Sequence, residues 1–212
     1  MKALVIGATG ATGKDLVGLL LSDPAYTEVV TFVRRPSGVT HHKLAEILTD
    51  YDKLEEISGQ ITGDVWFSCL GTTLKTAGSK EAQYQIDYEI PARFAAIAKK
   101  NGVSRLVLLS SYGASATSRV FYSRMKGQLE EHLASLAFDQ YIIFRPGLLV
   151  RKNTDRLGER LSARALNFFN SMGLMRKLRP LPTSILAEKM AKAPQIFPEG
   201  LHFVESAKIW EL

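Results

Sequence analysis

The stretch ALVIGATGATG, residues 3–13, places an apolar strand directly before a glycine-rich turn. Glycine recurs at every third position from Gly7 to Gly13, so the backbone can turn tightly and approach a pyrophosphate that a β-carbon would obstruct. A helix is predicted through residues 16–20, and its first N–H groups and the positive end of its dipole would face the phosphates. This context predicts a dinucleotide-binding turn. The residues expected to bind the cofactor there are Gly7, Thr9, Gly10, Ala11, Thr12 and Gly13.

Strands and helices alternate from this turn to residue 147. Helices are predicted between the strands, the longest over about 79–100 and 119–137. Several strands are apolar on both faces, which is typical of a parallel sheet covered by helices on both sides. The sequence therefore predicts the α/β class, with a Rossmann-type doubly wound parallel sheet. The predicted strands are residues 3–6, 29–33, 44–48, 64–68, 105–109 and 141–144.

The remaining chain is expected to extend this sheet on its substrate side. A length of 212 residues, 46% of them hydrophobic, favours one domain over residues 1–212, with residues 148–212 as a small C-terminal substrate or edge segment. A last strand is expected at 201–205, followed by a helical turn at 206–212. Apolar residues three or four apart predict one helix face that either packs on the sheet edge or covers the substrate end of the crevice. These residues are Leu157, Leu161, Ala165, Phe168 and Met172.

Two arginines, Arg34 and Arg35, follow the second predicted strand. NAD-specific proteins usually place a carboxylate there, which binds the 2′-hydroxyl of the adenosine ribose. A guanidinium can instead bind a 2′-phosphate through paired, charge-assisted hydrogen bonds. The pattern favours NADP(H) over NAD(H), and two arginines on a solvated loop are the alternative interpretation.

Tyr122 and Lys126 are four residues apart on a predicted helix, so they share one face. An ordinary tyrosine has a pKa of about 10, but a nearby ammonium stabilises the phenolate and makes proton transfer feasible near neutral pH. A serine hydroxyl at the end of the preceding strand, Ser111 or Ser110, can hydrogen-bond the same substrate oxygen. This spacing is common on helices by chance, and it gains meaning only beside the glycine-rich turn and the serines.

Five stretches of the chain resemble the short-chain dehydrogenase/reductase superfamily in its atypical branch, and most closely the Tat-interacting-protein-like oxidoreductases. The resemblance implies that Tyr122 is the acid–base group and that Lys126 orients the nicotinamide ribose and lowers the pKa of the tyrosine. It implies that Ser111 polarises the carbonyl, with Ser110 as the second choice. The matching stretches are GATGATG at 7–13, CLGTT at 69–73, LLSS at 108–111, YSRMKG at 122–127 and FRPG at 144–147.

The same resemblance implies further cofactor contacts, at Asp50 near the adenine and at Pro146 and Gly147 beside the nicotinamide. Turn chemistry also explains Gly147, and a helix cap also explains Asp50. Three residues would line the cofactor in place of the Asn-Asn-Ala-Gly run that other members carry: Leu70, Gly71 and Thr72. This departure leaves the asparagine proton relay of those members without an obvious counterpart.

These patterns support two functional hypotheses. The first is hydride transfer between NADPH and a carbonyl or conjugated alkene of a small molecule. The second is a non-catalytic NADP(H) sensor that reports to a protein partner, a role found among atypical members. The intact set of Ser111, Tyr122 and Lys126 favours the enzyme. A nucleotide-sugar epimerase or dehydratase would need more substrate-binding chain than the about 65 residues that follow Gly147.

Composition argues against several other classes. The net charge is +6, but basic residues are interleaved with acidic ones, so no nucleic-acid partner is expected. No stretch approaches the roughly 20 apolar residues that span a bilayer, and the first strand leaves no room for a signal peptide. The single cysteine, Cys69, is expected to be an inert buried thiol in a reducing, cytoplasmic compartment. The four histidines lack metal-site spacing, so no metal is expected. The oligomeric state is not determined.

Overall fold

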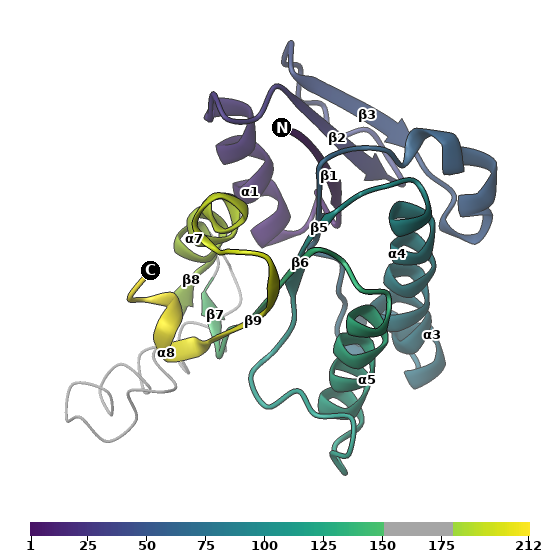
Figure 1. Ribbon diagram of the computed structural model, residues 1–212. Helices are drawn as coiled ribbons and strands as arrows, with labels where there is room; N and C mark the ends of the chain where they lie inside the picture. Colours follow the sequence, from purple (N-terminus) through teal and green to yellow (C-terminus); the bar gives the residue numbers. More distant parts are fainter. Residues whose placement is uncertain (151–179) are drawn as a thin grey trace.

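The structure is a computed structural model that describes residues 1–150 and 180–212, and a seven-stranded sheet forms its centre (Figure 1). The strands of this sheet are β1 (Lys2–Ile6), β2 (Glu28–Val33), β3 (Leu44–Leu48), β4 (Val65–Ser68), β5 (Arg105–Leu109), β6 (Gln140–Arg145) and β9 (Gly200–Glu205). Their order is β3-β2-β1-β4-β5-β6-β9, and every neighbouring pair is parallel. The predicted Rossmann-type sheet is confirmed, with each predicted strand in place.

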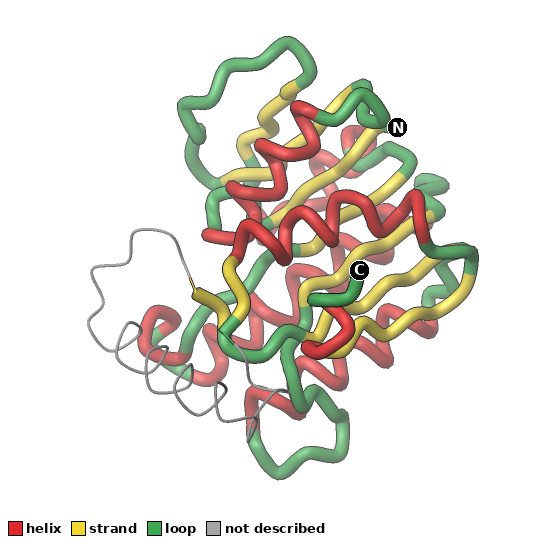
Figure 2. Tube along the Cα trace, turned by 90° about the vertical axis from the view of Figure 1, so that its left-hand side faces the viewer, coloured by secondary structure: helices red, strands yellow, loops and turns green. Residues whose placement is uncertain are grey.

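Helices cover both faces of the sheet because its strands are apolar on both sides. Helices α1 (Ala11–Ser22) and α7 (Thr183–Ile196) cover one face, and Figure 2 views the sheet from that side. Helices α4 (Ile90–Lys100) and α5 (Phe121–Ser135) cover the other. In β1, Val5 packs in the core under α1 and α7, whereas the adjacent Leu4 packs in the core under α4 and α5. The fold is therefore doubly wound.

The helix predicted over residues 79–100 is interrupted. It consists of α3 (Lys80–Tyr84), the π-helical turn η2 (Gln85–Glu89) and α4. Pro91 lies in the first turn of α4 and has no N–H to donate to the preceding turn, so the regular ladder of hydrogen bonds cannot continue there. Turns of this kind occur frequently at functional sites. This one carries Asp87, whose side chain is completely buried.

The C-terminal residues complete the sheet and its helical cover. Helix α7 packs along α1. In the loop that follows α1, the phenol of Tyr26 donates to the carbonyl of Ala191 in α7 at 2.6 Å. Strand β9 then pairs with β6. Two short strands, β7 (Leu149–Val150) and β8 (Leu181–Pro182), pair beside the main sheet, and α8 (Ser206–Ile209) provides the expected helical turn. The predicted apolar stripe on residues 157–172 lies outside the described residues. Residues 180–212 are therefore an integral part of the sheet domain.

Ion pairs of Arg145, the last residue of β6, tie α5 to the sheet. Its guanidinium donates to both carboxylate oxygens of Glu130 on α5, at 3.1 and 2.5 Å, and to Glu205 at the end of β9, at 2.9 Å. Glu130 is 4% exposed, so this ion pair is largely shielded from water. The network fixes α5 relative to the carboxyl ends of β6 and β9.

Gly127 on α5 tests how closely this helix packs on the loop that follows β5. A β-carbon at Gly127 would lie 2.2 Å from the backbone nitrogen of Ala116, a distance that no side-chain movement can relieve. We expect Gly127→Ala to lower the free energy of unfolding by about 2 kcal/mol or more, measured by urea denaturation.

The control is Gly18→Ala in α1, an exposed helical glycine whose added β-carbon would meet nothing within 4 Å. Alanine at this position should raise stability by about 0.5–1 kcal/mol, because it restricts the unfolded chain and favours helix. Equal effects of the two substitutions would contradict the packing argument.

Candidate functional site

The candidate site lies at the carboxyl ends of the strands, where the order of the sheet reverses beside β1. Three cavities of about 460, 470 and 430 Å³ follow one another along this edge. We call them the reacting, ribose and adenine cavities, after the roles that the sequence predicts for residues that line them. Leu70, which follows β4, lines all three. A row of linked cavities suits an elongated dinucleotide better than a compact ligand.

The glycine-rich turn forms one end of this row through close backbone contact. Gly7 has a φ of +76°, and a β-carbon on it would lie 2.4 Å from the carbonyl carbon of Cys69. A β-carbon on Gly13 would lie 2.1 Å from the Gly7 oxygen. Gly13 therefore allows α1 to pack on the turn and lines none of the three cavities.

The first residues of α1 face the reacting cavity. Gly10, Ala11 and Thr12 line it. Gly10 is the N-cap of α1, and no side chain caps the helix there. The first N–H groups of α1 are therefore available to an anion, as the sequence predicted.

The ribose cavity brings the two arginines to the glycine-rich turn. Arg34 and Arg35 are exposed and line this cavity together with Gly7 and Thr9. Arg34 also lines the adenine cavity. Both guanidinium groups can therefore reach a group that binds between the end of β2 and the turn.

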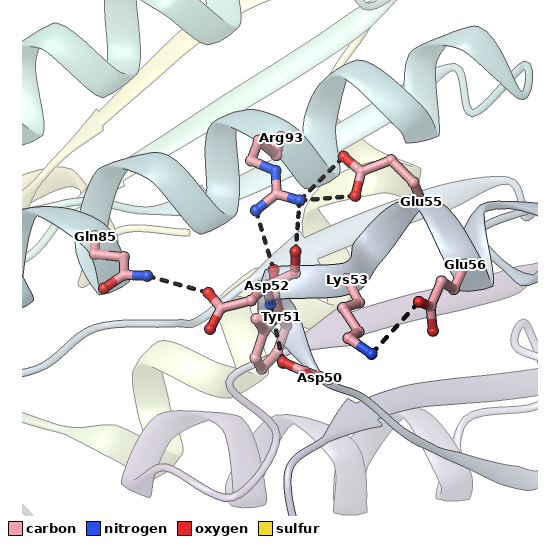
Figure 3. A network of polar contacts seen from close by, with 8 residues as sticks. All are labelled: Asp50, Tyr51, Asp52, Lys53, Glu55, Glu56, Gln85 and Arg93. Atoms are coloured by element: carbon pink, nitrogen blue, oxygen red, sulfur yellow. Dashed lines mark hydrogen bonds and ion pairs between the residues drawn. The ribbon is translucent and has the colours of Figure 1, made fainter.

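A polar network fixes the wall of the adenine cavity (Figure 3). The wall is the start of η1 (Tyr51–Gln60), a 3₁₀ segment where a short helix was predicted. Arg93 on α4 donates to the carbonyls of Tyr51 and Asp52, at 3.3 and 3.2 Å, and to the carboxylate of Glu55, at 3.0 and 2.8 Å. Asp50 lines the cavity and also accepts from the N–H of Asp52 at 3.1 Å. Asp50 therefore caps the 3₁₀ segment and also lines this cavity, and its contact with an adenine stays a prediction.

The reacting cavity brings Tyr122 and Lys126 together from one face of α5. Tyr122 is 37% exposed, Lys126 is 3% exposed, and the Lys126 ammonium lies 6.0 Å from the centre of the Tyr122 ring. Gly71 and Thr72 line the same cavity, as predicted, and so does Thr183 from α7. Thr183 belongs to no motif in the sequence, because only the packing of α7 on α1 brings it there.

Of the two serines, Ser110 lines the reacting cavity and Ser111 does not. Ser110 is 6% exposed, and the hydroxyls of both serines are buried without a hydrogen-bond partner among the described residues. Both serines follow the end of β5, and lining of the cavity is what separates them. This geometry favours Ser110, the second choice, over Ser111, the first choice.

Asp87 is a site residue that sequence reasoning missed. Its carboxylate contacts the Lys126 ammonium at 3.2 Å and accepts from the N–H of Thr72 at 2.9 Å. Asp87 precedes the buried Ile90 and Phe94 of α4 by three and seven residues, which is the spacing of one helix face. An acidic residue within an apolar helix stripe is the signal that could have identified it, because a buried carboxylate needs a partner.

Burial shifts the pKa values of Lys126 and Cys69, which both lie at this end of the site, in opposite directions. Burial lowers the pKa of Lys126, but Tyr122 and Asp87 raise it by more, so the pKa lies above its ordinary value and the group is an ammonium. Burial raises the pKa of the Cys69 thiol to about 12, although Lys126 opposes the shift. Cys69 is therefore a thiol at neutral pH, and Lys126 is charged.

Pro146 and Gly147 line none of the three cavities. The Pro146 carbonyl accepts from the N–H of Tyr112 at 2.9 Å, and the Gly147 N–H donates to the Ser206 hydroxyl at 3.3 Å. Leu149, two residues after Gly147, lines the reacting cavity, and the predicted contact of Pro146 and Gly147 with the nicotinamide stays a prediction.

The described residues, 1–150 and 180–212, contain no group of three His, Cys, Asp or Glu side chains that could hold a metal ion. None of the helices in these two ranges has the length and hydropathy of a membrane span.

Comparisons with known proteins agree with this geometry. A family profile described as NAD(P)H-binding matches residues 7–172. The mitochondrial protein FMP52 of Candida albicans is 36% identical over 191 residues, which cover 87% of this chain and 83% of that protein. HTATIP2 of Rattus norvegicus is 34% identical over 173 residues, which cover 79% of this chain and 70% of that protein.

Solved structures show the same fold at low identity. A short-chain dehydrogenase/reductase superfamily protein from Agrobacterium tumefaciens with bound NAD has a TM-score of 0.72 at 17% identity, covering 100% of this chain and 80% of that chain. MoeE5 in complex with UDP-glucose and NAD has a TM-score of 0.73 at 16% identity, covering 96% of this chain and 75% of that chain. At these identities the likeness shows the fold alone.

The relatives correct one expectation and confirm another. The expected cytoplasmic location is wrong, because FMP52 proteins that are 34–37% identical to this chain are named mitochondrial. A lone cysteine indicates a reducing compartment but does not identify which one. The family resemblance seen in the five sequence stretches is confirmed. The chain belongs to the NAD(P)H-binding family that includes FMP52 and HTATIP2.

Proposed function

We propose that this protein is an NADP(H)-dependent oxidoreductase that acts on a carbonyl or conjugated alkene of a small organic substrate. One observation carries the proposal. One cavity is lined by an exposed tyrosine, a buried charged lysine and a buried serine that has no hydrogen-bond partner among the described residues. The first residues of α1 line the same cavity. The three side chains are Ser110, Tyr122 and Lys126.

The cavities suit a nicotinamide dinucleotide. The uncapped N-terminus of α1 would hold the pyrophosphate, Arg34 and Arg35 the 2′-phosphate, and Asp50 the adenine. When bound, the reduced cofactor supplies the hydride that reduces the substrate carbon.

The side chains of the reacting cavity would supply the proton and stabilise the charge. In carbonyl reduction the substrate oxygen becomes negative as its carbon is reduced, and the Tyr122 phenol donates a proton to it. The Lys126 ammonium stabilises the phenolate that remains. The Ser110 hydroxyl, which lines this cavity and has no partner among the described residues, donates a hydrogen bond to the same oxygen. In the reverse direction the phenolate accepts the proton.

The alternative is a non-catalytic NADP(H) sensor that reports to a protein partner. Such a protein needs the ribose and adenine cavities but has no use for an acid–base group. The convergence of Tyr122, Lys126 and an unpartnered Ser110 on one cavity favours the enzyme.

The catalytic assignment is tested with Tyr122→Phe. The phenylalanine ring keeps the packing but cannot transfer a proton, so kcat should fall by at least about 100-fold, while the Kd for NADPH changes little. Oxidation of NADPH is followed over a panel of aldehydes, ketones and conjugated enones.

The matched control is Tyr112→Phe, which changes an exposed tyrosine that lines none of the three cavities and should retain activity. Unchanged turnover in Tyr122→Phe contradicts the catalytic role. NADPH binding by wild type without turnover of any panel member supports the sensor.

Cofactor choice is tested with the double variant Arg34→Ser/Arg35→Ser. Loss of two charge-assisted contacts to a 2′-phosphate should weaken NADPH binding by about 10- to 100-fold and leave NADH binding nearly unchanged. Isothermal titration calorimetry measures both constants. Lys100→Ser, at the far end of α4, controls for the loss of positive charge. Equal affinity of the wild type for NADPH and NADH is the result that contradicts this role of the arginines.

A further inference from the structure

Asp87 and Lys126 form an ion pair that is almost completely shielded from water. Asp87 is 0% exposed and Lys126 is 3% exposed, and the two charged groups lie 3.2 Å apart. A buried carboxylate is strongly destabilising without a partner, and a buried pair rarely adds net stability. The position of this pair beside the Tyr122 ring suggests a role in the chemistry of the cavity.

The surrounding backbone holds Asp87 in one place. Its second oxygen accepts from the N–H of Thr72 at 2.9 Å, and the carbonyl of Thr72 accepts from the buried Gln83 amide at 3.2 Å. A β-carbon on Gly71 would lie 3.2 Å from the Asp87 carboxylate and 3.9 Å from the Lys126 ammonium. The loop after β4 therefore packs directly on the ion pair, and the carboxylate has little freedom to turn away from Lys126.

The groups that act on Lys126 come from three elements. Tyr122 and Glu130 lie on α5 with it, Asp87 lies on η2, and the Cys69 thiol follows β4. Glu130 is occupied by Arg145, and Cys69 is uncharged at neutral pH because burial raises its pKa to about 12. Among the described residues, Asp87 is the carboxylate in direct contact with the ammonium.

We propose that Asp87 is a positioning residue that holds the Lys126 ammonium in place and limits how strongly the charge of that ammonium favours the phenolate of Tyr122. A negative charge opposes proton loss from every acid near it. With the carboxylate present, Tyr122 keeps its proton to higher pH than it would beside an unpaired ammonium. The phenol is the form that donates a proton during reduction, so Asp87 extends the pH range of the reductive reaction. This catalytic consequence rests on the proposed function.

The ionisation of Tyr122 can be measured without any substrate. Ultraviolet titration of phenolate absorbance is recorded for the full-length protein and for its Tyr122→Phe variant, and the difference isolates Tyr122 from the other six of the seven tyrosines. The same difference is then recorded in the Asp87→Asn background. Asparagine keeps the shape and can still accept from Thr72 but lacks the charge, so Tyr122 should ionise about one pH unit lower.

Two controls separate charge from structure. Asp87→Glu restores the charge and should return the titration toward wild type. Asp139→Asn makes the same chemical change in the exposed Lys99–Asp139 pair, at 3.3 Å, and should leave Tyr122 unaffected. If the asparagine variant does not fold by circular dichroism, Asp87→Ser is the second uncharged variant, because its hydroxyl can accept from Thr72. An unchanged or upward titration of Tyr122 in a folded uncharged variant overturns the proposal.

Turnover gives the second measurement. In Asp87→Asn, the basic limb of the kcat profile for reduction should move to lower pH by about the same amount as the titration, because less Tyr122 is protonated. A purely structural role would lower kcat at all pH values and leave the limb in place, which contradicts the proposal. A shifted titration without turnover in wild type would refute the proposed function alone, whereas Tyr122-dependent turnover with an unshifted titration would refute the role of Asp87 alone.

Discussion

The structure depends on a close backbone contact between the ends of β1 and β4. Gly7 lies so near Cys69 that a β-carbon would be 2.4 Å from the Cys69 carbonyl carbon, and Gly13 brings α1 equally close to Gly7. This contact joins β1 and β4, which are neighbours in the sheet. The strand order runs in opposite directions on the two sides of this pair. The contact also presents Leu70 along the strand ends, where that residue lines the reacting, ribose and adenine cavities. The contact that closes the fold therefore also shapes the binding site.

The reacting end combines a closed environment with charge. Tyr122 and Asp87 both favour the charged form of the buried Lys126, and the buried Asp87 carboxylate lies against the Lys126 ammonium and accepts a hydrogen bond from the Thr72 N–H. The π turn directs Asp87 inward, and Pro91 accounts for the break in the helical ladder beside it. Local irregularity of the helix is thus coupled to the electrostatics of the cavity. Arg145 serves a different purpose, since this residue of β6 pairs with Glu130 on α5 and with Glu205 on β9 and so joins the helix to both strands.

The fold alone does not specify the reaction. Solved structures with the same fold and 16–17% identity include a protein bound to UDP-glucose and NAD and a superfamily member bound to NAD. One sheet supports many chemistries because the reacting groups sit on loops and helix ends, which vary independently of the core. In this chain, Ser110, Tyr122 and Lys126 support oxidoreduction, and the two arginines after β2 support a preference for NADP(H).

The sequence by itself determined the positions of the strands along the chain, the glycine-rich turn and the shared face of Tyr122 and Lys126, because these follow from local apolar runs, glycine spacing and helical periodicity. It could not determine which serine lines the cavity, since both follow the end of β5 and only the path of the chain beyond that strand separates them. Nor could it place Asp87, α7 or Thr183. Those positions depend on contacts between segments far apart in the chain, such as Asp87 with Lys126 and Thr183 with Asp15. Tertiary packing alone brings these groups together, and it places the buried carboxylate beside the lysine at the reacting end.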